Sequence, residues 1–182
     1  MIEVERKYRV SDSQSYVKIL EEIDARNLGT TRQKDQVYLP SSIGSFREYE
    51  KGMPIVRIRT EDEAVTLTLK AGGEAHFTHE VETIVSDAEA TSQIIETLSM
   101  HQVMVIDKTR TTYRYEGFTI AIDHVVHLGD FLEVEILVDI ESKVTEAVEL
   151  IDLFASQKLG LSLDSVENER YDALLERAKV EE

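Results

Sequence analysis

The tripeptide Glu-Val-Glu occurs three times, as Glu3-Val4-Glu5, Glu80-Val81-Glu82 and Glu133-Val134-Glu135. Each copy lies in a run with strand-like alternation, and alternate side chains of a strand point to the same face. Every copy therefore places two carboxylates on one face and a valine on the other. Three such pairs facing one another would either hold a hard metal cation or repel one another strongly.

Basic residues are concentrated on other strand-like runs and follow the same alternation. Arg57 and Arg59 share a face opposite Val56 and Ile58, and Lys70 shares a face with two threonines. Lys108, Arg110 and Arg114 share a face of a later run. Guanidinium groups match the oxygens of a phosphate as a fork, whereas an ammonium acts as a point charge.

Carboxylates without histidine or cysteine partners favour Mg²⁺ or Mn²⁺. Several cations in the same cavity would select a polyanion. A metal with cations around a polyphosphate is typical of phosphoryl or nucleotidyl transfer, in which positioning and charge neutralisation dominate catalysis.

Several other chemistries are excluded or disfavoured. The chain has no cysteine, which excludes disulfides, thiolate nucleophiles and cysteine-ligated zinc. It has no G-x-x-x-x-G-K-[ST] loop and no G-x-G-x-x-G turn, so side chains must hold any phosphates. The five histidines lack metal-ligand spacing, and we expect surface or packing roles for His76, His79, His101, His124 and His127.

Length and composition predict one domain over residues 1–182, with 42% apolar and 31% charged residues. The net charge of −16 disfavours nucleic acid and anionic membranes as partners. No run is apolar enough to span a membrane, and the N-terminus does not read as a secretory segment. We expect a cytoplasmic protein, a monomer or a homodimer, that binds a small polyphosphate.

Strands and helices must position these charges. Period-2 alternation predicts strands at 2–10, 34–39, 55–60, 64–70, 77–85, 104–115, 118–124 and 131–138. Capping boxes at 11–14 and 86–89 begin two helices, the first of which should stop near Gly29. Two further helices are expected over 144–154 and 171–178, and a tight turn at Gly72-Gly73.

Two architectures can produce this pattern. One is an open antiparallel sheet with one face in water. The other is an α+β fold in which eight antiparallel strands close into a barrel, or tunnel, with a charged interior and helices outside. The separation of acidic and basic pairs on different strands, with little neutral filler, favours the closed barrel.

The same residues match a known family. Glu3-x-Glu5-x-Lys7 resembles the Glu-x-Glu-x-Lys signature of the CYTH superfamily, which includes class IV adenylyl cyclases, thiamine triphosphatases and other triphosphate tunnel metalloenzymes. The likeness continues in order along nearly the whole chain, through Arg57-Ile58-Arg59, Leu67-Thr68-Leu69-Lys70, Glu80-Val81-Glu82, Lys108-Thr109-Arg110 and the run from Asp123 to Glu135. That last run is most similar to the cyclase branch.

The resemblance implies an eight-stranded tunnel that binds a triphosphate with one or two divalent metals. It assigns the metal-side carboxylates to Glu3, Glu5, Glu133 and Glu135, with Asp123 beside them, and supporting roles to Glu80 and Glu82. It assigns the phosphate clamp to Lys7, Arg57, Arg59, Lys70, Lys108 and Arg110, of which Lys7, Lys108 and Arg110 are the catalytic candidates; Arg114 joins the substrate-binding set through its shared strand face.

Two positions depart from the family pattern. In place of Asp-x-Tyr in the second strand the chain has Gln36-Val37-Tyr38, and we expect Asp35, one place away, to face the other side. In place of Ser-Tyr near the C-terminus it has Arg170-Tyr171. Both departures concern substrate orientation more than metal binding.

Four functions remain open at this point. The first is a class IV adenylyl cyclase-like enzyme that uses Mg²⁺ or Mn²⁺ to convert ATP to cyclic AMP and pyrophosphate. The second is a triphosphatase acting on inorganic, thiamine or nucleoside triphosphate. A polyphosphate-binding module without turnover, or a solvated sheet that binds nothing, would carry a similar charge pattern.

Overall fold

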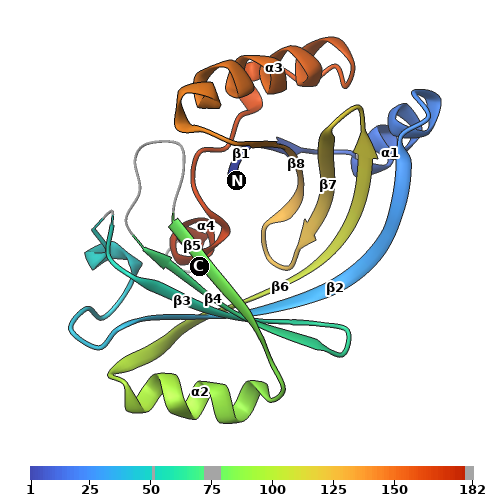
Figure 1. Cartoon of the computed structure of the whole chain (residues 1–182). Coiled ribbons are helices and arrows are strands. Elements are labelled where there is room, and N and C mark those ends of the chain that lie inside the picture. The colour runs from blue at the N-terminus through green and yellow to red at the C-terminus, as the bar shows by residue number, and fades with distance from the viewer. Residues whose placement is uncertain (51, 72–78, 179–182) are drawn as a thin grey trace. The chain divides into compact units, whose positions relative to one another are not determined.

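The computed structural model describes residues 1–50, 52–71 and 79–178, and Figure 1 labels its elements. The strands are β1 (Ile2–Val10), β2 (Arg26–Pro40), β3 (Ile55–Glu61), β4 (Ala64–Ala71), β5 (His79–Val85), β6 (Met100–Tyr115), β7 (Phe118–Val125) and β8 (Gly129–Val138). The helices are α1 (Ser13–Glu22), α2 (Ala88–Thr97), α3 (Val144–Gln157) and α4 (Tyr171–Ala178), with single 3₁₀ turns η1 (Phe46–Glu48), η2 (Glu141–Lys143) and η3 (Leu163–Ser165).

The strands form one eight-stranded sheet in the order β1-β8-β7-β6-β2-β3-β4-β5. The pairs β1/β8, β7/β8, β2/β3, β3/β4 and β4/β5 are antiparallel. This confirms the predicted α+β class and the antiparallel sheet.

The chain forms two compact units. The first comprises Met1–Thr31 and Thr109–Arg170, and the second comprises Arg32–Lys108 and the C-terminal segment from Tyr171. β2 and β6 are long strands that contribute a segment to each unit. Each unit has its own hydrophobic cluster and its own charged cluster.

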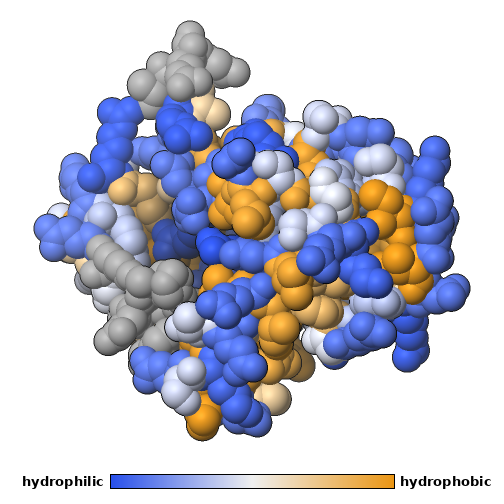
Figure 2. Space-filling view, turned by 90° about the horizontal axis from the view of Figure 1, so that it is seen from above, coloured by the Kyte–Doolittle hydropathy of each residue, from blue (hydrophilic) through white to orange (hydrophobic). Residues whose placement is uncertain are grey.

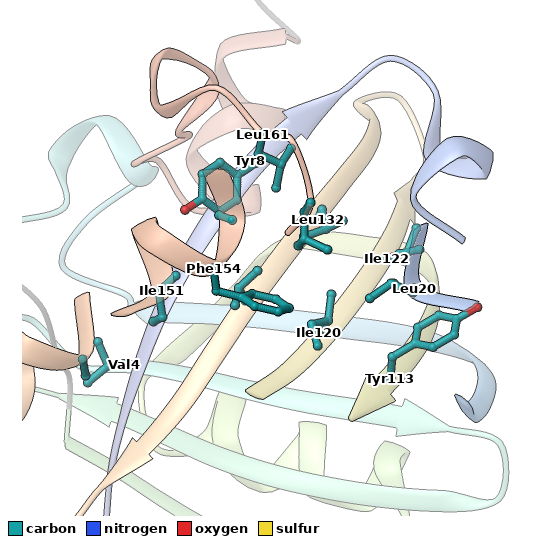
Figure 3. Packing of buried hydrophobic residues seen from close by; sticks show 14 of the residues in the cluster. Val4, Tyr8, Leu20, Tyr113, Ile120, Ile122, Leu132, Ile151, Phe154 and Leu161 are labelled. Carbon is teal, nitrogen blue, oxygen red and sulfur yellow. The ribbon is translucent and has the colours of Figure 1, made fainter. Parts of the chain in front are cut away.

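The core of the first unit lies between α3 and the strands β1, β7 and β8. Alternation in β1 buries Val4 and Tyr8, whereas Glu5 between them is exposed. Figure 3 shows Ile151 and Phe154 of α3 directed at the strands, and both belong to the same buried cluster as the strand residues Val4, Ile120, Leu132 and Val134. The Phe154 ring also stacks on Phe118, with centroids 4.2 Å apart.

A smaller core holds the second unit. Tyr38 of β2 and Ile58 of β3 are fully buried and pack with Ile95 of α2. The α2 helix begins where the Asp87 side chain accepts hydrogen bonds from the backbone amides of Glu89 and Ala90, so the cap is Asp87 and not the first residue, Ser86, of the predicted capping box. In both units, the helices therefore cover the strand face that carries the apolar residues.

Three boundaries differ most from the prediction, and the largest strand difference is in β2, which begins at Arg26, eight residues before the predicted start at 34. The first helix ends at Glu22, not near Gly29, because Asp24 takes a left-handed backbone conformation with φ of 58° and the chain turns into β2 at Arg26. β6 begins at Met100, four residues before the predicted start. The predicted turn at Gly72-Gly73, residues 77–78 of the predicted fifth strand, and His76 lie outside the described residues.

The surface combines hydrophilic residues with smaller apolar patches, and Figure 2 shows this mixture on one face. The exposed apolar residues include Leu150 and Leu153 on the outer side of α3. Within the described residues, no helix is both long and apolar enough to cross a membrane.

Replacement of Phe154 by alanine should lower the free energy of unfolding by about 3–5 kcal/mol, because it leaves a cavity beneath α3. Leu153→Ala on the same helix is the matched control. Since Leu153 is 51% exposed, its loss should cost less than about 0.5 kcal/mol. Chemical denaturation of both variants checks this, and equal losses would mean that α3 does not pack as described.

Candidate functional site

An arginine–carboxylate cluster lies on the strand face of the first unit that the helices leave uncovered. Arg110 of β6 donates two hydrogen bonds to Asp123 of β7, at 2.7 and 2.6 Å, and its Nη2 also donates to Glu133 of β8. The Asp123 side chain is fully buried. A bidentate arginine pair of this kind places a positive charge against the buried carboxylate and fixes the guanidinium plane.

Next to this cluster, β1 and β8 bring two glutamates into direct opposition. Glu5 pairs with Glu135 across the strands, and Lys7 pairs with Glu133. Burial and the charge of Glu5 raise the pKa of Glu135, against the opposing effect of Arg110 and Arg114. Like charges directly opposite each other in a sheet are destabilising.

The carboxylate oxygens of these residues are suitable ligands for a divalent cation. A bound Mg²⁺ or Mn²⁺ would remove the repulsion between Glu5 and Glu135, and oxygen ligands are those that both ions prefer. Within the described residues, the side chains do not gather three or more acidic or histidine groups at metal-binding distance. Asp123 and Glu133 accept hydrogen bonds from Arg110 in place of binding a metal. The strongest structural support for metal binding is therefore the Glu5–Glu135 pair.

Two further predicted site residues of the first unit, Glu3 and Arg114, lie at the edges of the cluster. Glu3 is exposed and pairs in register with Leu137 near the end of β8. Arg114 is exposed but close enough to oppose the rise in the pKa of Glu135.

The second unit carries a cluster that is mainly basic. Arg59 of β3 donates two hydrogen bonds of 2.7 Å to Asp35 of β2, and Arg57 Nη1 lies 3.9 Å from the same carboxylate. Burial alone would raise the pKa of Asp35, but Arg59, Arg57 and Lys108 together hold it below its ordinary value.

The expected orientation of Asp35 is therefore wrong. Asp35 pairs in register with Arg59, and Val37 pairs with Arg57. Directly opposed residues point to the same face, so Asp35 belongs to the charged cluster. Tyr38 is the residue that points away, into the core beneath α2, where its hydroxyl donates to Ser92.

β4 and β5 extend this cluster. Arg57 donates to Thr68 at 3.3 Å, Thr68 donates to Glu82 at 2.9 Å, and Glu82 lies 3.8 Å from Arg57. Lys70 forms an ion pair with Glu80. The two predicted supporting acids thus contact two of the predicted phosphate-binding cations.

Two features of this cluster suit a polyanion. The Nε of Arg57 is buried and has no hydrogen-bond acceptor, and burial and the neighbouring Arg59 lower the pKa of Arg57. Lys108 is 3% exposed, and its ammonium lies 5.1 Å from the centre of the Tyr171 ring. An arriving anion could accept hydrogen bonds from Arg57 and would be attracted by the neighbouring basic side chains.

Sequence reasoning identified most of these residues but not every role. Asp35 was misplaced because the pairing register of β2 and β3 is a property of the fold. Thr68 was recognised only as a polar strand residue, although it is fully buried and bridges Arg57 and Glu82. Tyr171, noted as a departure from the family pattern, contacts Lys108.

The model of the CYTH domain matches residues 1–171. The chain belongs to the CYTH family. Over 176 residues it is 27% identical to the adenylate cyclase CyaB of Aeromonas hydrophila, covering 97% of this chain and 90% of that one.

Solved structures share the fold. A conserved hypothetical protein from Pyrococcus furiosus is 26% identical with a TM-score of 0.80, covering 94% of this chain and 99% of the other. A Hippeastrum protein described as a candidate adenylyl cyclase with a dominant triphosphatase activity is 15% identical with a TM-score of 0.65, covering 98% and 95%. This last likeness concerns the fold alone.

Asp35→Asn should destabilise the protein by about 3 kcal/mol, because it leaves buried Arg59 without its counter-charge. Asp107→Asn is the matched control, since Asp107 makes the same two-hydrogen-bond pair with Arg32, whose side chain is 74% exposed. The control should lose less than about 1 kcal/mol. Denaturant titration of the two variants measures the difference.

The pH dependence provides a second readout of Asp35. A lowered folded-state pKa gives stability that is present above the ordinary value of 3.8 and is lost as the pH falls through the lower folded value. Wild type should therefore lose more stability than Asp35→Asn between pH 5 and about pH 2. Parallel curves for the two proteins would contradict the Asp35 assignment.

Glu135→Gln should stabilise the metal-free protein at neutral pH by about 0.5–1 kcal/mol, because it removes the repulsion with Glu5. A raised folded-state pKa means that wild type loses stability as the pH rises through that value, above the ordinary 4.5, and the variant should not. Glu133→Gln should instead be destabilising, because Glu133 contacts Arg110. Thermal melts across pH 4–8 check both outcomes; a loss of stability in Glu135→Gln would mean that Glu135 is a structural partner.

Proposed function

We propose that the protein is a divalent-metal-dependent enzyme that acts on a triphosphate, as an adenylyl cyclase that converts ATP to cyclic AMP and pyrophosphate. The observation that carries the proposal is the cation-rich cluster of buried Lys108 and partly buried Arg57 and Arg59, in which Arg57 Nε has no acceptor. The similarity to the CyaB cyclase and the carboxylate pair of Glu5 and Glu135 support it.

The proposal includes closure of the eight-stranded sheet into a tunnel. The charged faces of the strands would then line its interior, and the helices that cover the apolar faces would lie outside. Membership of the CYTH family supports this arrangement.

Each group of side chains has a distinct role. Arg57 would donate a fork of hydrogen bonds to phosphate oxygens, and Asp35 would hold Arg59 in place, as its two hydrogen bonds do now. Lys70 and Lys108 would neutralise charge as point charges. Thr68 would keep the Arg57 guanidinium oriented.

Glu3, Glu5, Glu133 and Glu135, with Asp123 beside them, would hold Mg²⁺ or Mn²⁺. When bound, such an ion neutralises phosphate charge and lowers the pKa of a coordinated hydroxyl or water. Glu80 and Glu82 would support the cations that they contact.

In the cyclase reaction, the ribose 3′-oxygen forms a bond to the α-phosphorus, and the bond to the β-phosphate bridge oxygen breaks. Lys7, Lys108 and Arg110 would stabilise the charge that develops on the departing pyrophosphate. The Asp123 and Glu133 contacts of Arg110 hold its guanidinium in one orientation, which reduces the reorganisation needed during the reaction.

The second candidate is a triphosphatase. The same clamp would bind inorganic, thiamine or nucleoside triphosphate, and water would attack the terminal phosphorus. The fold shared with the Hippeastrum protein described as having dominant triphosphatase activity favours keeping this candidate. Both reactions need the same charges, so the products must distinguish them.

Purified protein should therefore be incubated with ATP and Mg²⁺ or Mn²⁺, and with inorganic tripolyphosphate, and the products separated by ion-exchange chromatography. Cyclic AMP with an equal amount of pyrophosphate is expected. Orthophosphate without cyclic AMP would reject the cyclase and support the triphosphatase. Metal-dependent binding without any product would reject both.

Arg57→Ala should lower kcat/KM for the triphosphate by about 10²- to 10³-fold, because it removes a buried, preorganised cation. Arg26→Ala is the matched control, since Arg26 is an exposed arginine at the start of β2. Steady-state kinetics of both variants measures the effect. A similar small change in both would place the phosphates elsewhere.

A further inference from the structure

The first unit contains an open pocket of about 740 Å³ at the end of β1. Its lining comes from three segments that are far apart in the sequence: the end of β1 and the link to α1, the β7–β8 turn with the start of β8, and the segment around η3. The principal polar side chains are Arg9, Ser11, Asp130, Asp164, Ser165 and Glu167. None of the residue roles assigned above uses this pocket.

One wall of the pocket is flat and consists of the Arg9 guanidinium on the Phe131 ring, which we call the platform. The Arg9 guanidinium lies over the Phe131 ring, 4.7 Å from its centroid, and donates to the Leu128 carbonyl oxygen at 3.0 Å. Glu167 lies 3.8 Å from the same guanidinium. The Arg9 side chain nevertheless remains 46% exposed, so the plane fixed against Phe131 is accessible to a ligand.

The platform is continuous with the proposed triphosphate site. Arg9 pairs with Phe131, Lys7 with Glu133, and Glu5 with Glu135. These are alternate residue pairs of β1 and β8, so they share one face, and neighbouring pairs on that face are about 7 Å apart. A group stacked on Arg9 is therefore one such step from Lys7 and two steps from the carboxylate pair.

This geometry matches a nucleoside. Arginine planes and aromatic rings stack on nucleobases. The carboxylates and hydroxyls of Asp164, Ser165 and Glu167 can accept or exchange hydrogen bonds with ribose hydroxyls and exocyclic amines. The pocket volume is in the usual range for small-molecule sites.

We propose that this pocket binds the base and ribose of a nucleoside triphosphate, with the base stacked on Arg9. The assignment rests on the proposed function for the position of the phosphates, and it deepens that function by making a nucleotide, not inorganic triphosphate, the substrate. Arg9 is then a specificity-determining residue that touches the base.

Adenosine without phosphates tests the pocket independently of the triphosphate site. In amide NMR spectra of the full chain, adenosine should shift residues of the pocket, including Ser11, Leu128–Asp130 and Ser165–Glu167. Arg9→Ala should weaken adenosine binding about tenfold, the loss expected for one stacked base. Arg26→Ala, another exposed arginine, should leave adenosine binding unchanged.

A second variant separates stacking from charge. Arg9→Lys keeps the positive charge but loses the guanidinium plane, so it should weaken adenosine binding nearly as much as Arg9→Ala. In both variants the affinity for ATP relative to inorganic tripolyphosphate should fall about tenfold. Full affinity in Arg9→Lys would mean that Arg9 acts only as a charge and would overturn the stacking assignment.

Adenosine shifts that avoid the pocket residues would overturn the proposal, whatever the protein does with triphosphates. Loss of all binding and turnover of ATP and tripolyphosphate would instead reject the proposed function, and the adenosine titration would still decide the pocket. Pocket shifts that appear only with tripolyphosphate would assign the pocket to phosphate and would also overturn the nucleoside assignment.

Discussion

The need to compensate buried charge constrains both units of this protein. In the first unit β1, β7 and β8 turn apolar side chains to α3, and in the second unit β2 and β3 turn apolar side chains to α2. Arg110 compensates Asp123 and Glu133, and Arg59 compensates Asp35, which offsets the free-energy cost of burying these charges. Like charges nevertheless lie close together in each unit, Glu5 with Glu135 and Arg57 with Arg59.

The two units compensate charge in different ways. In the first unit Arg110 contacts Asp123 and Glu133 beside the opposed Glu5 and Glu135. In the second unit Arg59 holds Asp35. The same logic explains why removal of one charged partner has different effects in different places. Loss of Asp35 leaves a cation without compensation, whereas loss of Glu135 relieves a repulsion.

The helices α2 and α3 support the charged strand faces by packing on the opposite, apolar faces. α3 buries Ile151 and Phe154 against β1, β7 and β8, and α2 buries Ile95 against Tyr38 and Ile58. Because strand alternation is strict, packing of the apolar residues fixes which side chains lie on the opposite face. Val4 and Val134 are buried against the helices, so the adjacent residues Glu5 and Glu135 must point to the opposite face.

The sequence by itself determined the antiparallel α+β class, the family and most charged residues of the site, because period-2 alternation and the Glu-x-Glu-x-Lys signature are local patterns. Only the tertiary structure decided that Asp35 faces the arginines and that Glu133 pairs with Arg110. Those facts depend on the register between strands, such as Asp35 with Arg59. The pocket at Arg9 also needed the tertiary structure, since three distant segments of the chain form its walls. Register and pocket shape arise from contacts between residues far apart in the chain, which no local pattern encodes.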